Sequence, residues 1–124
     1  MMTPHKRLKK LCDKLWAECI KLRAGGKSEY SGKTERLHAH HIVGKSCYRL
    51  RYELLNGVCL TAGEHCFIAH RADRYETFRK FVKRVRGEAF YEQMDILKAV
   101  SSPPDLRLIK LYLEKEKEKL TNVL

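Results

Sequence analysis

The sequence lacks any hydrophobic run that approaches the roughly twenty residues of a membrane span, and its N-terminus lacks the apolar core of a signal peptide. It also lacks a Cys-x-x-Cys pair, and its five cysteines are an odd number. A disulfide framework is therefore not expected, because such frameworks pair their cysteines. These absences predict a chain that works in the reducing cytoplasm without a membrane partner.

Acidic residues are scarce beside basic ones. The chain has 26 Lys and Arg against 15 Asp and Glu, which gives a formal net charge of +11. Such an excess favours a polyanionic partner, and DNA in particular, although a basic chain can also owe its charge to solubility or nonspecific adhesion. A chain of 124 residues without internal repeats is expected to form one domain with a modest core.

Histidine is concentrated in one stretch. Five of the six histidines lie in residues 37–70, LHAHHIVGKSCYRLRYELLNGVCLTAGEHCFIAH. Residues 38–43 are expected to form a strand, 58–60 a second strand after an Asn-Gly turn signal, and 63–70 the start of a helix. Because strand side chains alternate between faces, His38 and His40 share one side of the first strand and His41 lies on the other. Imidazoles on this frame are able to hold one metal ion, and in a basic protein they indicate phosphate chemistry.

The order His40-His41-Ile42, Asn56, His65 resembles the motif of the HNH (His-Me finger, ββα-metal) nucleases. The longer string AGGKSEYSGKT…LHAHHIVGK…LRYELLNGVCLTAGEH…AHR is similar to the phage lambda NinG (Rap) type of recombination nuclease and to related phage HNH proteins, over residues 12 to 95. The resemblance implies an α+β fold, with a small ββα-metal core flanked by several amphipathic helices. It also implies that His40 and His65 bind a metal ion, that His41 is the general base, and that Asn56 holds the loop between the strands.

Phosphodiester hydrolysis requires such roles. The reaction needs a deprotonated water in line with the leaving oxygen, and positive charge where negative charge builds up. His41 would take the proton of the water, and a divalent ion on His40 and His65 would stabilise the leaving oxygen. Mg²⁺ or Mn²⁺ is expected, with Zn²⁺ or Ni²⁺ as alternatives. His70 lies about one and a half α-helical turns beyond His65, so it is a candidate third metal ligand, a phosphate contact or an exposed surface residue.

Many HNH proteins hold a structural zinc with two Cys-x-x-Cys pairs, and this chain departs from that pattern. The corresponding positions are Ser28, Ser31, Thr61 and Glu64. Hydroxyls and one carboxylate are poor zinc ligands, so no structural zinc is expected, and the hairpin is expected to be held by packing. An alternative is an improvised zinc site formed by Cys47, Cys59, Cys66 and His65. A further hypothesis is a regulatory zinc-binding protein that uses the Cys and His residues.

Helical periodicity surrounds the histidine stretch within a single expected nuclease domain, residues 1–124. Residues 1–25 are expected to form a basic helix from a Thr3-Pro4 cap to a glycine stop, residues 27–72 the ββα core, and residues 73–124 further helices. The basic face of the first helix is expected to follow a DNA backbone. It comprises Lys6, Arg7, Lys9, Lys10, Lys14, Lys21 and Arg23.

The C-terminal region is expected to contain three helices. An apolar stripe begins at Tyr75 in the first of them, the second ends at Ser101-Ser102, and the last starts near Asp105. Leu108 and Leu111 fall outside the apolar stripe of that last helix, which favours docking on the domain or a homodimer through the C-terminal helices.

Basic side chains near the histidines are the candidate DNA contacts, and Arg71 and Arg74 are expected to continue the helix beside the site. The full set is Lys45, Arg49, Arg51, Arg71 and Arg74. The leading hypothesis is a metal-dependent DNA endonuclease of phage type, acting in recombination or DNA processing. The alternative is a non-catalytic nucleic-acid-binding module that keeps the HNH fold.

Overall fold

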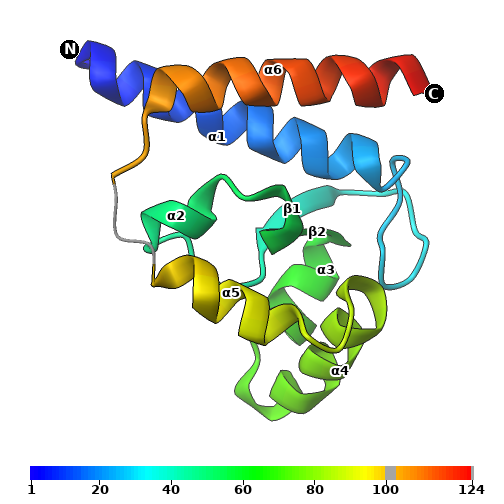
Figure 1. Cartoon of the computed structure of the whole chain (residues 1–124). Coiled ribbons are helices and arrows are strands. Elements are labelled where there is room, and N and C mark those ends of the chain that lie inside the picture. Colours follow the sequence, from blue (N-terminus) through cyan, green and yellow to red (C-terminus); the bar gives the residue numbers. More distant parts are fainter. Residues whose placement is uncertain (100–102, 124) are drawn as a thin grey trace.

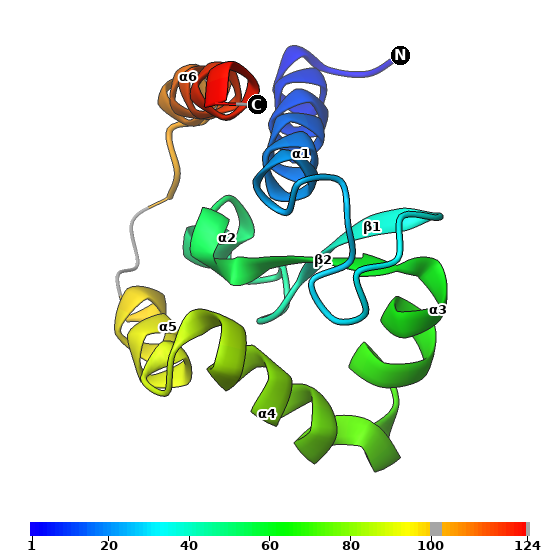
Figure 2. The same ribbon diagram turned by 90° about the vertical axis from the view of Figure 1, so that its right-hand side faces the viewer.

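The computed structural model describes residues 1–99 and 103–123, and in this part of the chain the fold is α+β. A two-stranded antiparallel sheet lies between two layers of helices (Figure 1, Figure 2). The elements in chain order are α1 (Pro4–Arg23), β1 (Leu37–His41), α2 (Tyr48–Arg51), η1 (Leu54–Asn56), β2 (Gly57–Thr61), α3 (Ala62–Glu64), η2 (His65–Ala69), η3 (Ala72–Arg74), α4 (Tyr75–Arg86), α5 (Phe90–Lys98) and α6 (Leu106–Val123). Ser101 and Ser102, the expected end of a helix, lie outside the described residues.

The two strands predicted from the histidine stretch are confirmed. In their antiparallel pairing Leu37 lies opposite Thr61 and His41 lies opposite Gly57, and β1 is shorter at its end than the predicted 38–43. Alternate residues of β2 enter different cores, since Val58 packs with α4 and α5 while Cys59 packs with α1 and α6. The sheet therefore separates two hydrophobic clusters.

Helix α1 confirms the predicted N-terminal helix. The Thr3 hydroxyl accepts a hydrogen bond from the Lys6 backbone N–H, Pro4 is the first helical residue, and the helix ends at Arg23. Arg23 differs from the expectation of a basic outer face, because its guanidinium donates hydrogen bonds of 2.8 Å to the carbonyls of Leu54 and Gly57. It supports the loop between the strands and is not part of the exposed basic surface.

Helix α6 lies beside α1 and runs in the same direction (Figure 1). The thiol of Cys12 donates to the Leu106 carbonyl and the thiol of Cys19 to the Leu113 carbonyl, with the same separation of 94 residues in both pairs. Because the sequence separation between the paired residues stays the same along both helices, the two helices run parallel. Together these helices form a layer over the α1 face of the sheet (Figure 2). No helix among the described residues is both long enough and apolar enough to cross a membrane.

The outer face of α6 carries the two leucines that were predicted to lie outside its apolar stripe. Leu108 is 64% exposed and Leu111 is 51% exposed, which confirms that neither belongs to the core. The homodimer expected from this surface stays a prediction.

The opposite layer consists of α4 and α5 with the helical segment that follows β2. Phe78, Phe81 and Val82 are buried as the helical stripe predicted, but Tyr75 is 60% exposed. The prediction that Arg71 and Arg74 continue the helix that begins near His65 is wrong. That helical segment ends at Ala69, and the separate 3₁₀ turn η3 precedes α4. The break turns α4 back under the sheet (Figure 2).

Candidate metal centre

Strand β1 directs its two adjacent histidines to opposite faces of the sheet. His40 lies on the α4 side, where its ring contacts Phe78 at a centroid distance of 5.6 Å. His41 lies on the α1 side, where its ring stacks on Trp16. The period of two in an extended strand produces this separation, so the two imidazoles have different surroundings although they are neighbours in the sequence.

Three imidazoles converge on the His40 side. The candidate ligand nitrogens of His40, His65 and His70 all lie within 4.8 Å of one another. The ring of His40 lies 4.6 Å from that of His65 and 5.0 Å from that of His70. This arrangement is close enough to hold a metal ion, and among the described residues it is the only such group of three or more potential ligands.

An unusual helical turn brings His70 to this group. Residues His65–Ala69 form a π-helix, in which backbone bonds join residues five apart. In an α-helix a residue five positions on points well away from the first, whereas a π turn returns it to nearly the same side. The rings of His65 and His70 therefore lie 4.7 Å apart, and of the three roles considered for His70, the geometry favours that of ligand.

Two of the three candidate ligands, His40 and His65, have lowered pKa values that favour the neutral state required for metal binding. Burial, followed by the neighbouring imidazoles of His65 and His70, lowers the pKa of His40 to about 3. Burial and then His70 and His38 lower the pKa of His65. Because a protonated imidazole has no lone pair for a cation, these shifts keep the nitrogens available near neutral pH.

His38 is an additional member of the cluster. Its Nδ1 lies 3.0 Å from Nδ1 of His65, so the two rings share a hydrogen bond on the exposed side of the group. In the tautomer in which His65 donates, its Nε2 carries the free lone pair. A partner on the outer nitrogen orients an imidazole ligand and fixes its tautomer, as is usual around protein metal sites.

His41 is oriented by a carbonyl group. Its Nε2 lies 2.9 Å from the Arg51 carbonyl oxygen, which can only accept, so Nε2 carries the proton and Nδ1 keeps its lone pair. Burial lowers the pKa of His41 although the Arg51 carbonyl raises it, and Lys45 and the Arg51 guanidinium add to the lowering. The ring is therefore neutral and has one nitrogen free to accept a proton.

His40, His41, His65 and His70 all line one pocket of about 500 Å³, which we call the histidine pocket. His38 is not among its lining residues. The pocket is lined by Asp13, Trp16, Ala17, Ala39, His40, His41, Gly44, Lys45, His65 and His70. The rings of His40 and His41 leave β1 on different faces and still reach the same pocket. A cation site and a neutral base thus border one space.

Asn56 fixes the loop that closes this pocket. Its side chain is fully buried, accepts a hydrogen bond of 2.8 Å from the Val43 N–H, and donates to the carbonyls of Val43 and Leu50. These bonds join the residue that precedes β2 to the loop after β1 and to α2. The expected function of Asn56 as a brace between the strands agrees with this geometry.

The positions that correspond to zinc cysteines in the HNH pattern meet in a hydrogen-bonded network. Ser28 Oγ donates to Glu64 Oε1, which also accepts from the Thr61 N–H, and the Thr61 hydroxyl accepts from the Glu64 N–H. Burial opposes ionisation of Glu64, but bonds from Ser28, Ser31 and Thr61 outweigh it and lower its pKa. These hydrogen bonds connect the four positions in addition to the packing that was expected to hold the hairpin.

The alternative thiol site is not formed among the described residues. Cys59 is buried in the cluster under α1, Cys47 packs against the cluster on the other face of the sheet, and Cys66 is exposed. These thiols point into different surroundings, and only His65 of the proposed set belongs to the ligand group.

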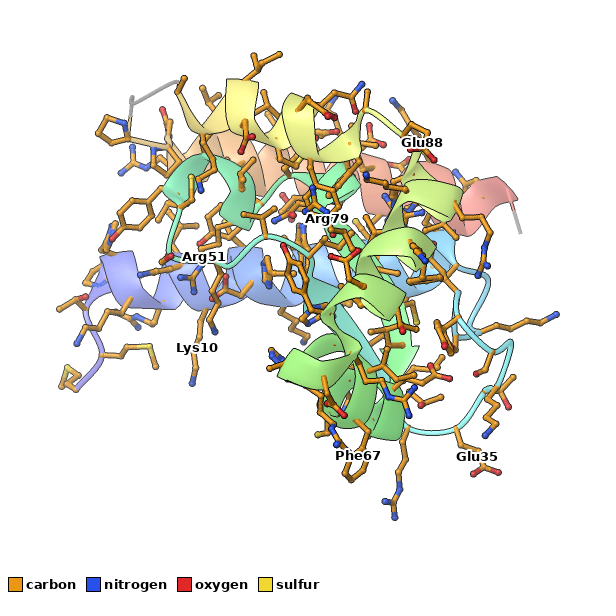
Figure 3. The ribbon with its side chains drawn as sticks, turned by 90° about the horizontal axis from the view of Figure 1, so that it is seen from below. Lys10, Glu35, Arg51, Phe67, Arg79 and Glu88 are labelled. Atoms are coloured by element: carbon orange, nitrogen blue, oxygen red, sulfur yellow. The ribbon has the colours of Figure 1, made fainter. Side chains whose placement is uncertain are left out.

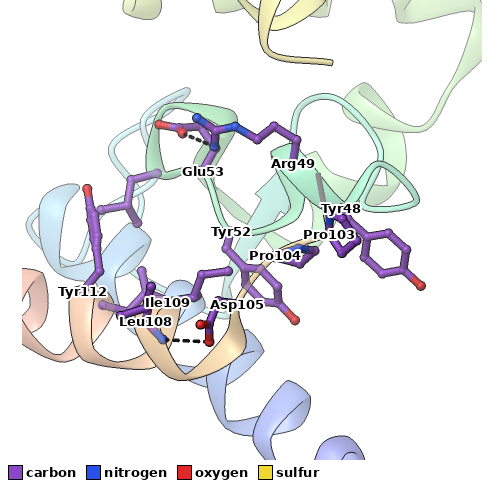
Figure 4. Close-up of a pocket in the computed structure, with 12 residues that line it drawn as sticks. Tyr48, Arg49, Tyr52, Glu53, Pro103, Pro104, Asp105, Leu108, Ile109 and Tyr112 are labelled. Atoms are coloured by element: carbon purple, nitrogen blue, oxygen red, sulfur yellow. Dashed lines mark hydrogen bonds and ion pairs between the residues drawn. The ribbon is translucent and has the colours of Figure 1, made fainter. Parts of the chain in front are cut away.

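The predicted DNA contacts lie in different places. Lys45 lines the histidine pocket and is exposed. Arg51 is bound through two hydrogen bonds of 2.9 and 2.7 Å to Asp13, which fixes its side chain against α1. Arg49 pairs with Glu53 and lines a separate pocket beside α6 (Figure 4).

The remaining arginines lie beyond the histidine turn. Arg71 pairs with Asp73 on the surface, and Arg74 is exposed at the end of η3. Lys10 extends from α1 into solvent, and Phe67, in the middle of the π-helix, is 64% exposed (Figure 3). Of the five predicted DNA contacts, Lys45 alone is among the residues that line the histidine pocket.

Sequence reasoning missed Asp13 and Trp16, which form the α1 wall of the pocket. Both lie in a helix far from the histidine stretch, and a helical stripe indicates burial without naming the residue on the other side. An acidic and an aromatic residue three positions apart in a strongly basic helix were the one available signal. A scan against protein-family models and searches of curated proteins and of solved structures found no match to this chain.

Proposed function

We propose that this protein is a metal-dependent DNA endonuclease of the ββα-metal (HNH) kind that hydrolyses phosphodiester bonds. The observation that carries the proposal is the shared pocket, which is lined both by the ligand group His40, His65 and His70 and by His41. The resemblance of the His-His-Ile, Asn, His order to HNH nucleases supports the same assignment. The proposal also fits the net charge of +11, which favours a polyanionic substrate.

In the proposed reaction the residues of the chain have separate tasks. Nδ1 of His41 accepts a proton from the attacking water, while the Arg51 carbonyl holds the Nε2–H and stabilises the imidazolium that forms. The water oxygen attacks phosphorus as the bond to the leaving oxygen breaks. Lys45 contributes positive charge to the bound phosphate. A divalent ion on His40, His65 and His70, when bound, supplies Lewis-acid stabilisation of the leaving oxygen.

The donor set indicates which ions fit best. All three ligands are neutral imidazoles without a carboxylate among them. Imidazole suits Zn²⁺, Ni²⁺ and other transition metals, whereas Mg²⁺ prefers oxygen ligands in an octahedron. Transition metals therefore fit this site better than Mg²⁺, and coordination positions beyond the three nitrogens are left for water and phosphate.

The test is cleavage of supercoiled plasmid DNA by the metal-depleted protein after addition of Mg²⁺, Mn²⁺, Zn²⁺ or Ni²⁺. We expect nicking that a chelator abolishes and that His41→Ala reduces by about 100-fold or more, the usual contribution of a general base. His5→Ala is the matched control, because His5 is exposed on α1 outside the pocket and its loss is expected to change nothing. Plasmid binding with equal, metal-independent behaviour of wild type and His41→Ala would contradict the proposal and favour the non-catalytic DNA-binding module.

A further inference from the structure

The only tryptophan in the chain lies against the proposed general base. The indole of Trp16 and the imidazole of His41 are stacked, with ring centroids 3.8 Å apart and ring planes within 5°. Trp16 is 2% exposed and belongs to α1, outside the strand and turn segments that carry the histidines. Stacking of two flat rings fixes the plane in which the imidazole lies.

The indole is itself held on two sides. Its Nε1–H donates a hydrogen bond of 3.0 Å to the Glu53 carbonyl, which anchors the ring to the loop between the strands. A Cβ atom at Gly57 would lie 2.7 Å from Cζ2 of Trp16, so the absence of a side chain there allows the ring to fit against β2. Trp16 therefore presents a rigid face to His41.

A second restraint acts within the plane of the imidazole. The bond from Nε2 to the Arg51 carbonyl sets the rotation of the ring about its own axis. Arg51 in turn is fixed by its paired hydrogen bonds to Asp13, less than one helical turn before Trp16 on α1. Helix α1 thus supports both restraints, one directly and one through Arg51.

Resting on the proposed function, we propose that Trp16 is a positioning residue for the His41 base and that Asp13 assists it through Arg51. Trp16 sets the plane of the imidazole and the Arg51 carbonyl sets its rotation, so Nδ1 has one direction into the pocket. Without the indole the ring keeps its lone pair but loses this direction. A loss of orientation slows the chemical step and leaves substrate and metal binding unchanged.

The kinetic test compares Trp16→Leu, which removes the flat face, with Trp16→Phe, which keeps one. Misplacement of a reacting group costs on the order of 100-fold in rate, so we expect kcat of Trp16→Leu to fall by up to that factor with KM and the metal Kd within about twofold. Trp16→Phe is expected to recover most of the rate. Leu15→Ala is the matched control for loss of packing, because Leu15 is buried on α1 and is not part of the histidine pocket.

A structural measurement tests the stack without cleavage. The ring protons of His41 lie over the indole and are expected to resonate upfield in the NMR spectrum of the metal-free protein at a fixed pH above neutrality. The upfield shift should disappear in Trp16→Leu, stay in part in Trp16→Phe, and stay unchanged in Leu15→Ala. An unshifted His41 in the wild type would overturn the inference.

The outcomes separate this inference from the proposed function. If the wild type cleaves DNA and Trp16→Leu has the same kcat, the positioning role of Trp16 is overturned while the endonuclease assignment stands. If Trp16→Leu and Leu15→Ala lose kcat equally, the effect of Trp16 is general packing and the inference is again overturned. If the wild type cleaves nothing with any of the ions, the proposed function fails and, with it, the catalytic role inferred for Trp16.

Discussion

The two faces of β1 hold adjacent histidines in opposite chemical settings. On the α4 face His40 is buried among other imidazoles, and the group has the spacing of a cation site. On the α1 face His41 is separated from that group, stacks on an indole and donates to a carbonyl. The difference shows that a period of two lets a strand place a candidate metal ligand and a candidate base at consecutive residues.

Replacing each histidine in turn is the strongest way to break this comparison. His41→Ala is expected to slow plasmid cleavage by about 1,000-fold, within the range for a general base, while the metal Kd stays within about twofold. His40→Ala is expected to abolish both metal binding and cleavage. Calorimetric titration with Ni²⁺ and a cleavage assay on the same samples provide the measurement. A His41→Ala variant that no longer binds metal would show that the two faces do not have separate functions.

His38 offers a smaller test of the metal face. His38→Ala removes the hydrogen bond to the outer nitrogen of His65, and the loss of such a partner weakens metal affinity by about 10- to 100-fold. Calorimetric titration with Ni²⁺ measures the change, and His5→Ala serves as a histidine control away from the cluster. An affinity equal to that of the wild type would mean that His65 is oriented by its helix alone.

The hydrogen-bonded network around Glu64 is a further test of the metal face, because Glu64 directly precedes His65 and the network holds that turn in place. Ser28 is 4% exposed, donates to Glu64, and accepts from the N–H groups of Tyr30 and Ser31. Ser28→Ala leaves these groups without their partner, and we expect unfolding free energy to fall by about 1–3 kcal/mol in urea titrations. Ser46→Ala, at an exposed loop serine, is the control. A fall no larger than that of the control would contradict a structural role for the network.

Acidic pH should destabilise the metal-free protein through the buried imidazoles. The folded-state pKa of His40 is lowered to about 3, below the ordinary value of 6.5, so the unfolded state binds more protons once pH falls below 6.5. Stability is thus complete above that pH and is lost toward pH 3. Between pH 7.5 and 5.5 we expect His40 alone to account for about 1 kcal/mol, with His41 and His65 adding in the same direction.

Urea titrations of wild type and His40→Gln at both pH values, with chelator present, measure this contribution. The variant should show a smaller loss of unfolding free energy on acidification than the wild type. An equal loss in the two proteins would contradict the assignment of a neutral, buried imidazole at position 40.

Local sequence patterns predicted the strands and helices. They did not predict the contacts between segments that are distant in the sequence. Alternation placed His40 and His41 on different faces, and helical spacing predicted α1 from its cap to its glycine stop. The sequence predicted the metal-ligand role of His70 only as one of three options. In an α-helix His70 would point away from His65, and a π turn leaves no sequence pattern that reveals it. The partners of Arg51 and Trp16 depend on how α1 packs across the sheet, which charge and periodicity do not encode.

The most direct test of the central claim is anomalous X-ray diffraction from crystals of the protein soaked with Ni²⁺ or Mn²⁺. We predict one ion bound by nitrogens of His40, His65 and His70, with His41 outside the coordination shell and its Nδ1 facing the same pocket. An ion coordinated by His41, or an ion absent from this group and bound elsewhere, would contradict the division of work between the two faces of β1.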